Sequence, residues 1–187
     1  MKIVFAVCGS FCNHKNALNA LKELISAGHD VTPVLSEIVC NTDTRFGTKD
    51  TFILNTETLC GKKVIAGIKE AEEILTPKQY DLLIICPCTG NTLAKIANGI
   101  TDSTVAMTAK IFFRNRKPVL IALATNDALG MTLRNIGTLA VRKNVYFVPL
   151  AQDDCLKKPD SLVCDFKQII VSAENAVQGI QTQPCIE

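Results

Sequence analysis

Residues 82–99 read LLIICPCTGNTLAKIANG. An apolar run enters Pro87, and a group of small polar residues then precedes a segment whose apolar side chains have helical spacing. A run that is apolar on both faces is typical of a parallel strand covered by helices on both sides. Thr, Gly and Asn fill a core poorly, but they present hydroxyls, an amide and backbone N–H groups. The stretch therefore predicts a strand over 81–86, a turn that faces a ligand, and a helix over 91–99.

The same alternation extends in both directions along the chain. Further short apolar runs predict four more strands, at residues 2–8, 31–35, 118–124 and 145–149. Apolar residues at helical spacing predict helices over residues 17–27, 64–75, 103–114 and 128–142, and a final helix within residues 160–180. Residues 36–62 are less regular.

Local signals at two helix ends support this interpretation. Gly28 is a suitable residue to follow the first helix, and a strand begins directly after it, so strands 2–8 and 31–35 are expected to be parallel. Pro77 is expected to stop the helix over 64–75. Strands that alternate with helices predict an α/β fold, a three-layer Rossmann-like doubly wound parallel sheet.

The 187 residues fit one domain, 1–187, with a tail that we expect to be frayed from about residue 181. The net charge of +2, the scattered Lys and Arg, and the absence of Trp argue against nucleic acid as a partner. The longest apolar runs reach about half a membrane span, so we expect no membrane segment.

The cysteine content indicates a reducing compartment. The nine cysteines are odd in number, and several lie in apolar segments, where a free thiol behaves as a small hydrophobic group. We therefore predict a cytoplasmic protein without disulfides. Because His14 and His29 are the only histidines and no CxxC pair exists, we predict no metal site.

Polar residues gather where the predicted strands end. In doubly wound sheets, ligands bind beyond the carboxyl ends of the strands. Apart from Phe11, the residues at these ends carry a hydroxyl or an amide or are glycine, and the full set is Gly9, Ser10, Phe11, Ser36, Thr89, Gly90, Asn91, Thr92, Thr125 and Asn126. Each alone could be an ordinary helix cap, but the gathering of several at one edge favours a binding site.

The ligand that this edge suits best is a mononucleotide. Gly9 and Ser10 precede a helix and offer backbone N–H groups and a hydroxyl to an anion, most simply a phosphate. The chain has neither GxGxxG after its first strand nor GxxxxGK[ST], which disfavours a dinucleotide and a nucleoside triphosphate. FMN has a single phosphate, so its binding loop needs fewer glycines than the loops that bind a dinucleotide or a nucleoside triphosphate.

The stretch PCTGNTLAKIANGITDS at 87–103 resembles the signature of the flavoprotein family that includes flavin-dependent cysteine decarboxylases and flavin prenyltransferases. Three further stretches narrow the resemblance to the flavoprotein (B) subunits of spore dipicolinate synthases: NTDTRFG at 41–47, TNDALG at 125–130 and FVPLAQDDCLKKPDS at 147–161. The resemblance covers residues 2 to about 166.

The resemblance implies an FMN-binding subunit that takes part in oxidising a dihydrodipicolinate-type precursor to pyridine-2,6-dicarboxylate during sporulation. It implies a nicotinamide-binding A subunit as partner, a homo-oligomer of trimers or larger, and the cytoplasm of the mother cell. The resemblance also implies roles for single residues. Gly9, Ser10 and Ser36 would hold the phosphate, the turn 89–92 would face the flavin, and Thr125 and Asn126 would close over the ring.

The chain departs from the related decarboxylases in two places. It has no histidine after the second strand, where the decarboxylases carry their base, and LATNDALGM replaces their PxMNxxMW-like segment. The prenyltransferases differ at Asn91 and at TNDALG. A decarboxylase-like or prenyltransferase-like enzyme, or a non-catalytic subunit that stabilises a partner, remain the alternatives.

Charged side chains near the same edge are weaker candidates. Arg45, Lys157 and Lys158 are cations that could bind a dicarboxylate. Arg45 could equally be a solvated loop residue, and for the pair Lys157-Lys158 we favour plain solvation. Asp127 and the pair Asp153-Asp154 could act as a general base, but we favour turn or capping roles for them. Cys12 and Cys88 could be reactive at a helix N-terminus, and we favour small core residues instead.

Overall fold

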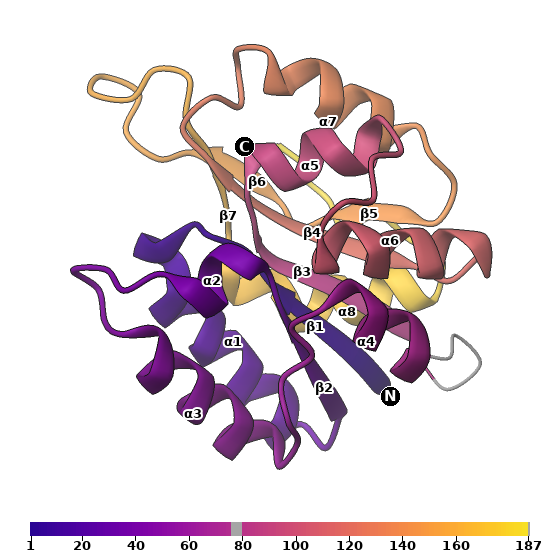
Figure 1. Cartoon of the computed structure of the whole chain (residues 1–187). Helices are drawn as coiled ribbons and strands as arrows, with labels where there is room; N and C mark the ends of the chain where they lie inside the picture. The colour runs from indigo at the N-terminus through magenta and orange to yellow at the C-terminus, as the bar shows by residue number, and fades with distance from the viewer. Residues whose placement is uncertain (76–79, 187) are drawn as a thin grey trace.

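The centre of the computed structural model is a parallel sheet, and the structure describes residues 1–75 and 80–186 (Figure 1). Its parallel strands are β1 (Lys2–Val7), β2 (Asp30–Leu35), β3 (Leu82–Cys88), β4 (Val119–Thr125) and β5 (Val145–Phe147). They lie in the order β2-β1-β3-β4-β5. β1, β3 and β4 are almost wholly buried, as their apolar sequences require. The predicted strands and the parallel pairing of β1 with β2 are confirmed.

The sheet is mixed rather than wholly parallel, which corrects the prediction. Two strands were not predicted, β6 (Leu150–Gln152) and β7 (Leu162–Cys164), and they pair antiparallel with each other. β7 also runs antiparallel to the end of β4, at Ala124 and Thr125. The edge of β4 is thus shared, because its first half pairs with β5 and its last residues pair with β7.

Helices cover both faces of the sheet (Figure 1). α1 (His14–Ser26) and α8 (Ile169–Val177) pack on one face, and α4 (Ile68–Ile74), α5 (Gly90–Ala97), α6 (Thr104–Arg114) and α7 (Thr132–Ala140) pack on the other. Two short 3₁₀ turns, η1 (Phe11–Asn13) and η3 (Phe166–Gln168), precede α1 and α8. The α/β fold with a mostly parallel sheet flanked by helices is therefore as predicted, and no described helix has the length and apolar character needed to cross a bilayer.

The region between β2 and β3 is more regular than its sequence suggested. It contains α2 (Glu37–Asn41) and α3 (Lys49–Cys60). α3 starts where the Thr48 hydroxyl accepts a hydrogen bond from the Thr51 N–H (3.3 Å), and it ends at Gly61, whose φ is 62°. The expectation of irregular structure here was wrong.

Two predicted helices are shorter than expected. The helix over 64–75 begins only at Ile68, because Ile65 instead extends along the edge of β2 and exchanges backbone hydrogen bonds with Pro33 and Leu35. The helix over 128–142 begins at Thr132. Pro77, the expected stop of the first, lies outside the described residues.

The C-terminal residues contact the sheet, contrary to the frayed tail that we expected. The Gln181 side chain donates a hydrogen bond to the carbonyl of Phe147 (2.7 Å) and accepts one from its N–H (2.8 Å). The Leu150 N–H then donates to the Cys185 carbonyl (2.9 Å). These bonds bind the segment to β5 and β6.

Candidate functional site

The loops that follow β1, β3 and β4 meet in an open cleft of about 770 Å³ at the carboxyl ends of the strands, which we call the main cleft. The structure brings together here most of the residues expected to bind a ligand, namely Gly9, Ser10, Phe11, Thr89, Gly90, Asn91, Thr125 and Asn126. Cys12, Arg45, Asp127, Asp153 and Lys158 line it as well.

A second space of about 680 Å³, the adjoining hollow, continues from the main cleft. Gly9, Thr89 and Asn91 line both. The two remaining predicted residues, Ser36 and Thr92, line the hollow. The hydroxyl and amide groups at the strand ends therefore form one continuous band along the edge of the sheet.

Helix capping explains part of this band. The Thr89 hydroxyl accepts a hydrogen bond from the Thr92 N–H (3.2 Å) and thereby caps α5. Ser10 makes no capping bond, and its hydroxyl accepts a hydrogen bond from the Asn13 side chain (3.2 Å). The Thr89 hydroxyl therefore caps a helix, whereas the Ser10 hydroxyl accepts a hydrogen bond from a side chain of its own loop.

Ser36 is the residue that capping does not explain. It precedes α2, yet its side chain makes no capping hydrogen bond, and its buried hydroxyl has no partner among the described residues. An unpaired buried hydroxyl costs free energy, about 1–3 kcal/mol, unless a ligand or water completes it. At the boundary of the adjoining hollow, this orphan group points to a bound polar ligand.

Glycine is required at two points of the band because other groups approach closely. A Cβ at Gly9 would lie 2.9 Å from Cγ2 of Ile38. A Cβ at Gly90 would lie 2.9 Å from the Thr125 hydroxyl and 3.1 Å from the Thr132 hydroxyl. The wall of the main cleft at Gly90 is therefore a tight junction between β4, α5 and α7.

Asp127 has the contacts of a turn residue. Its carboxylate accepts a hydrogen bond from the Thr132 hydroxyl (3.1 Å), and its N–H donates to the Thr125 hydroxyl (3.4 Å). Because these bonds shape the loop between β4 and α7, they fit the structural role that we favoured over a general base.

The predicted substrate cations occupy different positions. The Arg45 guanidinium lies 4.9 Å from the centroid of the Phe46 ring, at the mouth of the main cleft. Lys158 forms an ion pair with Asp153 in the same cleft. Lys157 is not one of the lining residues, and its ammonium group lies 3.9 Å from the Asp154 carboxylate. Arg45 and Lys158 are thus the cations that a ligand in the main cleft could reach.

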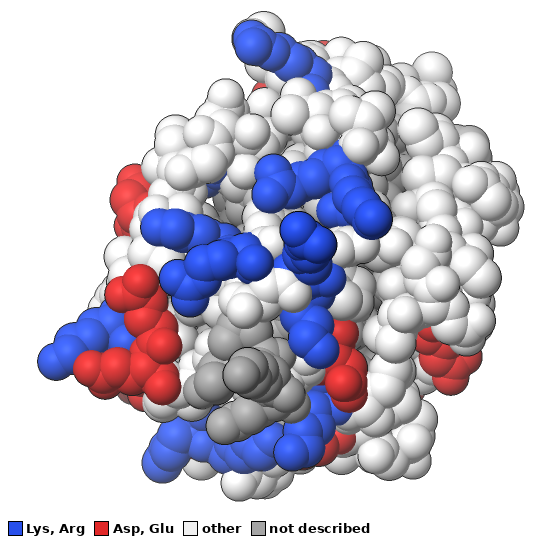
Figure 2. Space-filling model, turned by 90° about the vertical axis from the view of Figure 1, so that its right-hand side faces the viewer, with Lys and Arg blue, Asp and Glu red and all other residues white. Residues whose placement is uncertain are grey.

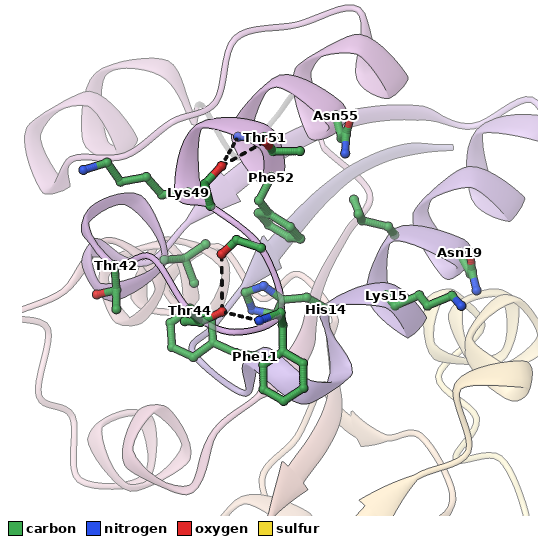
Figure 3. Close-up of a pocket in the computed structure, with 15 residues that line it drawn as sticks. Phe11, His14, Lys15, Asn19, Thr42, Thr44, Lys49, Thr51, Phe52 and Asn55 are labelled. Atoms are coloured by element: carbon green, nitrogen blue, oxygen red, sulfur yellow. Dashed lines mark hydrogen bonds between the residues drawn. The ribbon is translucent and has the colours of Figure 1, made fainter.

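An aromatic pocket of about 330 Å³ lies on the other side of Phe11 and Phe46, between α1 and α3 (Figure 3). His14 lies at its base, with its ring centroid 4.9 Å from that of Phe11 and 4.3 Å from that of Phe52. Its Nε2 lies 2.9 Å from the Cys8 carbonyl and must donate that hydrogen bond. Burial lowers the pKa of His14, so the ring is a neutral packing element of the wall.

The buried cysteines are core residues. Cys8, Cys86, Cys88 and Cys164 are buried. A hydrogen bond to the Cys8 thiol, together with burial, raises the pKa of Cys88 well above its ordinary value. A protonated, enclosed thiol is a poor nucleophile, which agrees with the core role that we favoured for Cys88. Cys12, in contrast, is exposed in the main cleft.

Several lining residues were not predicted. Phe46, Thr132 and Ser161 complete the main cleft, and Glu37 and Lys95 line the adjoining hollow. Phe46 belongs to NTDTRFG and is 54% exposed in the structure, and the available signal in the sequence was an aromatic residue beside an Arg in a polar segment. Glu37 follows Ser36 at the end of β2, whereas Thr132, Ser161 and Lys95 come from positions away from the strand ends.

Comparison with known proteins identifies the family of the chain. The family model described as Flavoprotein matches residues 1–180. The B subunit of dipicolinate synthase from Bacillus subtilis (strain 168) is 37% identical over 185 residues, which cover 99% of this chain and 92% of that protein. The crystal structure of the corresponding B subunit from Bacillus halodurans C matches with a TM-score of 0.90 and 36% identity, over 100% of this chain and 95% of that one.

More distant structures share the fold alone. The FMN-dependent cysteine decarboxylase SpaF matches with a TM-score of 0.68 and 21% identity, over 96% of this chain and 97% of that one. Taken together, these findings show that the chain belongs to the flavoprotein family and, within it, is a homologue of the B subunit of dipicolinate synthase.

Proposed function

We propose that the chain is the FMN-binding subunit of a dipicolinate synthase and that FMN lies along the band formed by the main cleft and the adjoining hollow. The observation that carries the proposal is the buried hydroxyl of Ser36 beside Gly9, which no described residue pairs with, at one end of a continuous row of hydroxyl and amide groups. A phosphate oxygen would complete that hydroxyl, and a planar ring system would follow the row.

The residues of the band divide into two roles. Gly9, Ser10 and Ser36 would hold the phosphate, since a glycine here leaves the backbone open and the two hydroxyls can donate to it. The turn of residues 89–92 would contact the polar edge of the isoalloxazine ring. Thr125 and Asn126, across the main cleft, would close over the ring.

The substrate that we propose is a dihydrodipicolinate-type dicarboxylate, which becomes pyridine-2,6-dicarboxylate by loss of two electrons and two protons. Bound FMN would supply the redox chemistry. Arg45 and Lys158 would bind the carboxylates, because both cations line the main cleft. We propose no residue for proton removal.

The wider setting follows from the resemblance to dipicolinate synthase. We propose a nicotinamide-binding A subunit as partner, a homo-oligomer of trimers or larger, and action in the mother-cell cytoplasm of a sporulating bacterium. The function is an oxidoreductase activity that needs both subunits.

Flavin retention tests the cofactor site. Ser10→Asp places a negative charge where the phosphate would bind, so we expect FMN affinity to fall by at least about tenfold, which corresponds to about 1.4 kcal/mol. Ser26→Asp, at the exposed end of α1, makes the same charge change elsewhere and should leave affinity unchanged. Equal affinity of Ser10→Asp and the unaltered chain, measured by flavin fluorescence, would refute the phosphate assignment.

Reconstitution tests the reaction. Dipicolinate should form only when both subunits and FMN are present, and Arg45→Met should raise KM more than it lowers kcat if Arg45 binds the substrate carboxylate. Product from the A subunit alone at an equal rate would instead identify a non-catalytic stabilising subunit. Decarboxylation or prenyl transfer by the chain alone would identify one of the other family activities.

A further inference from the structure

Five cations gather at the end of the sheet opposite to the main cleft. The basic surface consists of Arg114, Arg116, Lys117, Arg142 and Lys143, which lie at and after the C-terminal ends of α6 and α7. Figure 2 shows Lys and Arg side chains crowded on this side of the molecule. A depression of about 500 Å³ lies among them, lined by Phe113, Arg116, Lys117, Arg142, Lys143 and Asn144.

The cations have no acidic counterpart within the described parts of the chain. The depression is lined by no Asp or Glu, and none of the five forms an ion pair there. The sequence explains this directly, because residues 103–126 and 128–152 contain no acidic residue. With a net charge of only +2 for the whole chain, the charge is strongly concentrated on one surface.

Helix dipoles account for only a small part of this charge. Two helices, α6 and α7, end at the basic surface. The C-terminus of a helix carries about half a negative charge, so two helix ends offset about one of the five positive charges. The remainder is available to a partner.

The basic surface is held in a fixed shape. Arg116 and Asn144 both have positive φ, 54° and 66°. The Asn144 side chain donates a hydrogen bond to the Arg116 carbonyl (2.8 Å), and the Val119 N–H donates to the Asn144 carbonyl (2.9 Å). These bonds join the two loops, so the backbone that carries the cations is already ordered and loses less conformational entropy when a partner binds.

The side-chain types fit a protein partner. The basic surface holds three of the five arginines of the chain, which are Arg45, Arg114, Arg116, Arg134 and Arg142, and arginine is enriched in protein interfaces. Single-stranded nucleic acid would need exposed aromatic faces, whereas the Arg142 guanidinium lies 4.1 Å from the centroid of the Phe113 ring and covers it. A symmetric contact with a second copy would bring cations against cations.

We propose that the basic surface docks an acidic surface of the second subunit of the synthase. This rests on the proposed function, which supplies a two-subunit enzyme. β4 runs from Val119, beside the basic surface, to Thr125 in the main cleft, so the partner would dock at the opposite end of the sheet and leave the main cleft open to ligands.

Charge reversal tests the docking. In Arg116→Glu/Lys143→Glu, neither altered side chain makes a described hydrogen bond or ion pair, so folding should be preserved, with an unchanged circular dichroism melt as the check. We expect the Kd for the purified A subunit to rise by at least about tenfold, or about 1.4 kcal/mol. The matched control, Lys22→Glu/Lys167→Glu, reverses two exposed cations on α1 and η3 and should bind as the unaltered chain does.

Salt gives a second measurement. Raising the ionic strength from about 0.1 M to about 1 M shortens the Debye length from about 10 Å to about 3 Å, and this should weaken binding of the unaltered chain more than that of the charge-reversed variant. Equal Kd values for all chains, no association of the unaltered chain with the A subunit, or an effect of charge reversal on duplex DNA binding alone would each overturn the docking proposal.

The two proposals fail in different ways. If the chain takes up no FMN and the mixture forms no dipicolinate, yet charge reversal still weakens association with the A subunit, the proposed function is wrong and the docking surface stands. The charge-reversed chain can also be mixed with the A subunit over a range of A-subunit concentrations. If this mixture forms dipicolinate as fast as the unaltered chain does at every concentration, the docking surface is wrong and the proposed function stands.

Discussion

Gly90 shows how a single residue limits the shape of the main cleft. Gly90 lies so close to the Thr125 and Thr132 hydroxyls that the Cβ of an alanine there would be 2.9 Å and 3.1 Å from them. We expect Gly90→Ala to cost about 1–3 kcal/mol of the free energy of unfolding, as overpacked substitutions do, and to weaken FMN binding because the shifted threonines belong to the same wall. Urea unfolding and flavin titration measure the two effects.

Gly137 provides the matched control for Gly90. It lies within α7, and a Cβ there would meet nothing within 4 Å. Gly137→Ala should therefore stabilise the chain by about 0.5–1 kcal/mol through helix propensity alone and leave FMN affinity unchanged. Equal effects of the two substitutions on unfolding would contradict the tight junction at Gly90.

At the residue scale, the sequence predicted the side chains that stand directly at strand ends. Ser10, Ser36 and Thr89 follow apolar runs, so topology alone places them at one edge. Thr132 and Ser161 reach the same cleft from α7 and from the segment before β7. Their positions depend on how loops fold back across the sheet, which no local pattern encodes.

At the scale of elements, the short strand β5 depends on a side chain for part of its pairing. The Gln181 amide both donates to the Phe147 carbonyl and accepts from its N–H, so it acts as a neighbouring strand would. Gln181→Ala leaves these backbone groups unpaired, and we expect a loss of about 1–3 kcal/mol in the free energy of unfolding. Chemical denaturation measures it.

Gln178 serves as the comparison for Gln181. Its side chain is exposed at the end of α8, so Gln178→Ala should change stability by less than about 0.5 kcal/mol. If both variants unfold at the same denaturant concentration as the unaltered chain, the C-terminal segment does not contribute to the stability of β5.

The elements that were not predicted share a physical reason. β6 and β7 are each three residues long, too short for a periodic pattern, and they exist because they pair with each other and with β4. α3 packs Phe52, Ile53, Leu59 and Cys60 against the core only partly buried, and the polar Thr56 and the exposed Leu54 blur its apolar stripe in the sequence. The long elements, such as β3 and α6, bury most of their residues and were predicted closely.

At the scale of the whole molecule, the nine cysteines report on both the core and the main cleft. Cys12 and Cys155 are exposed, whereas Cys8, Cys86, Cys88 and Cys164 are buried. A thiol reagent should therefore modify Cys12 and Cys155 rapidly, and the buried group only when the chain unfolds globally. Partly buried thiols should react at intermediate rates, because burial raises the pKa of Cys60 to about 11 and leaves little thiolate at neutral pH.

FMN should slow the modification of one of the two rapidly reacting thiols and not of the other. Cys12 lines the main cleft and Cys155 does not, so saturating FMN should protect Cys12 in proportion to the fraction of chain that holds the flavin and leave the rate at Cys155 unchanged. Cys12→Ser and Cys155→Ser assign the two phases of the reaction with a chromogenic disulfide. An unchanged rate at Cys12 under saturating FMN would place the flavin outside the main cleft, since a ligand that fills this space must cover the thiol on its wall.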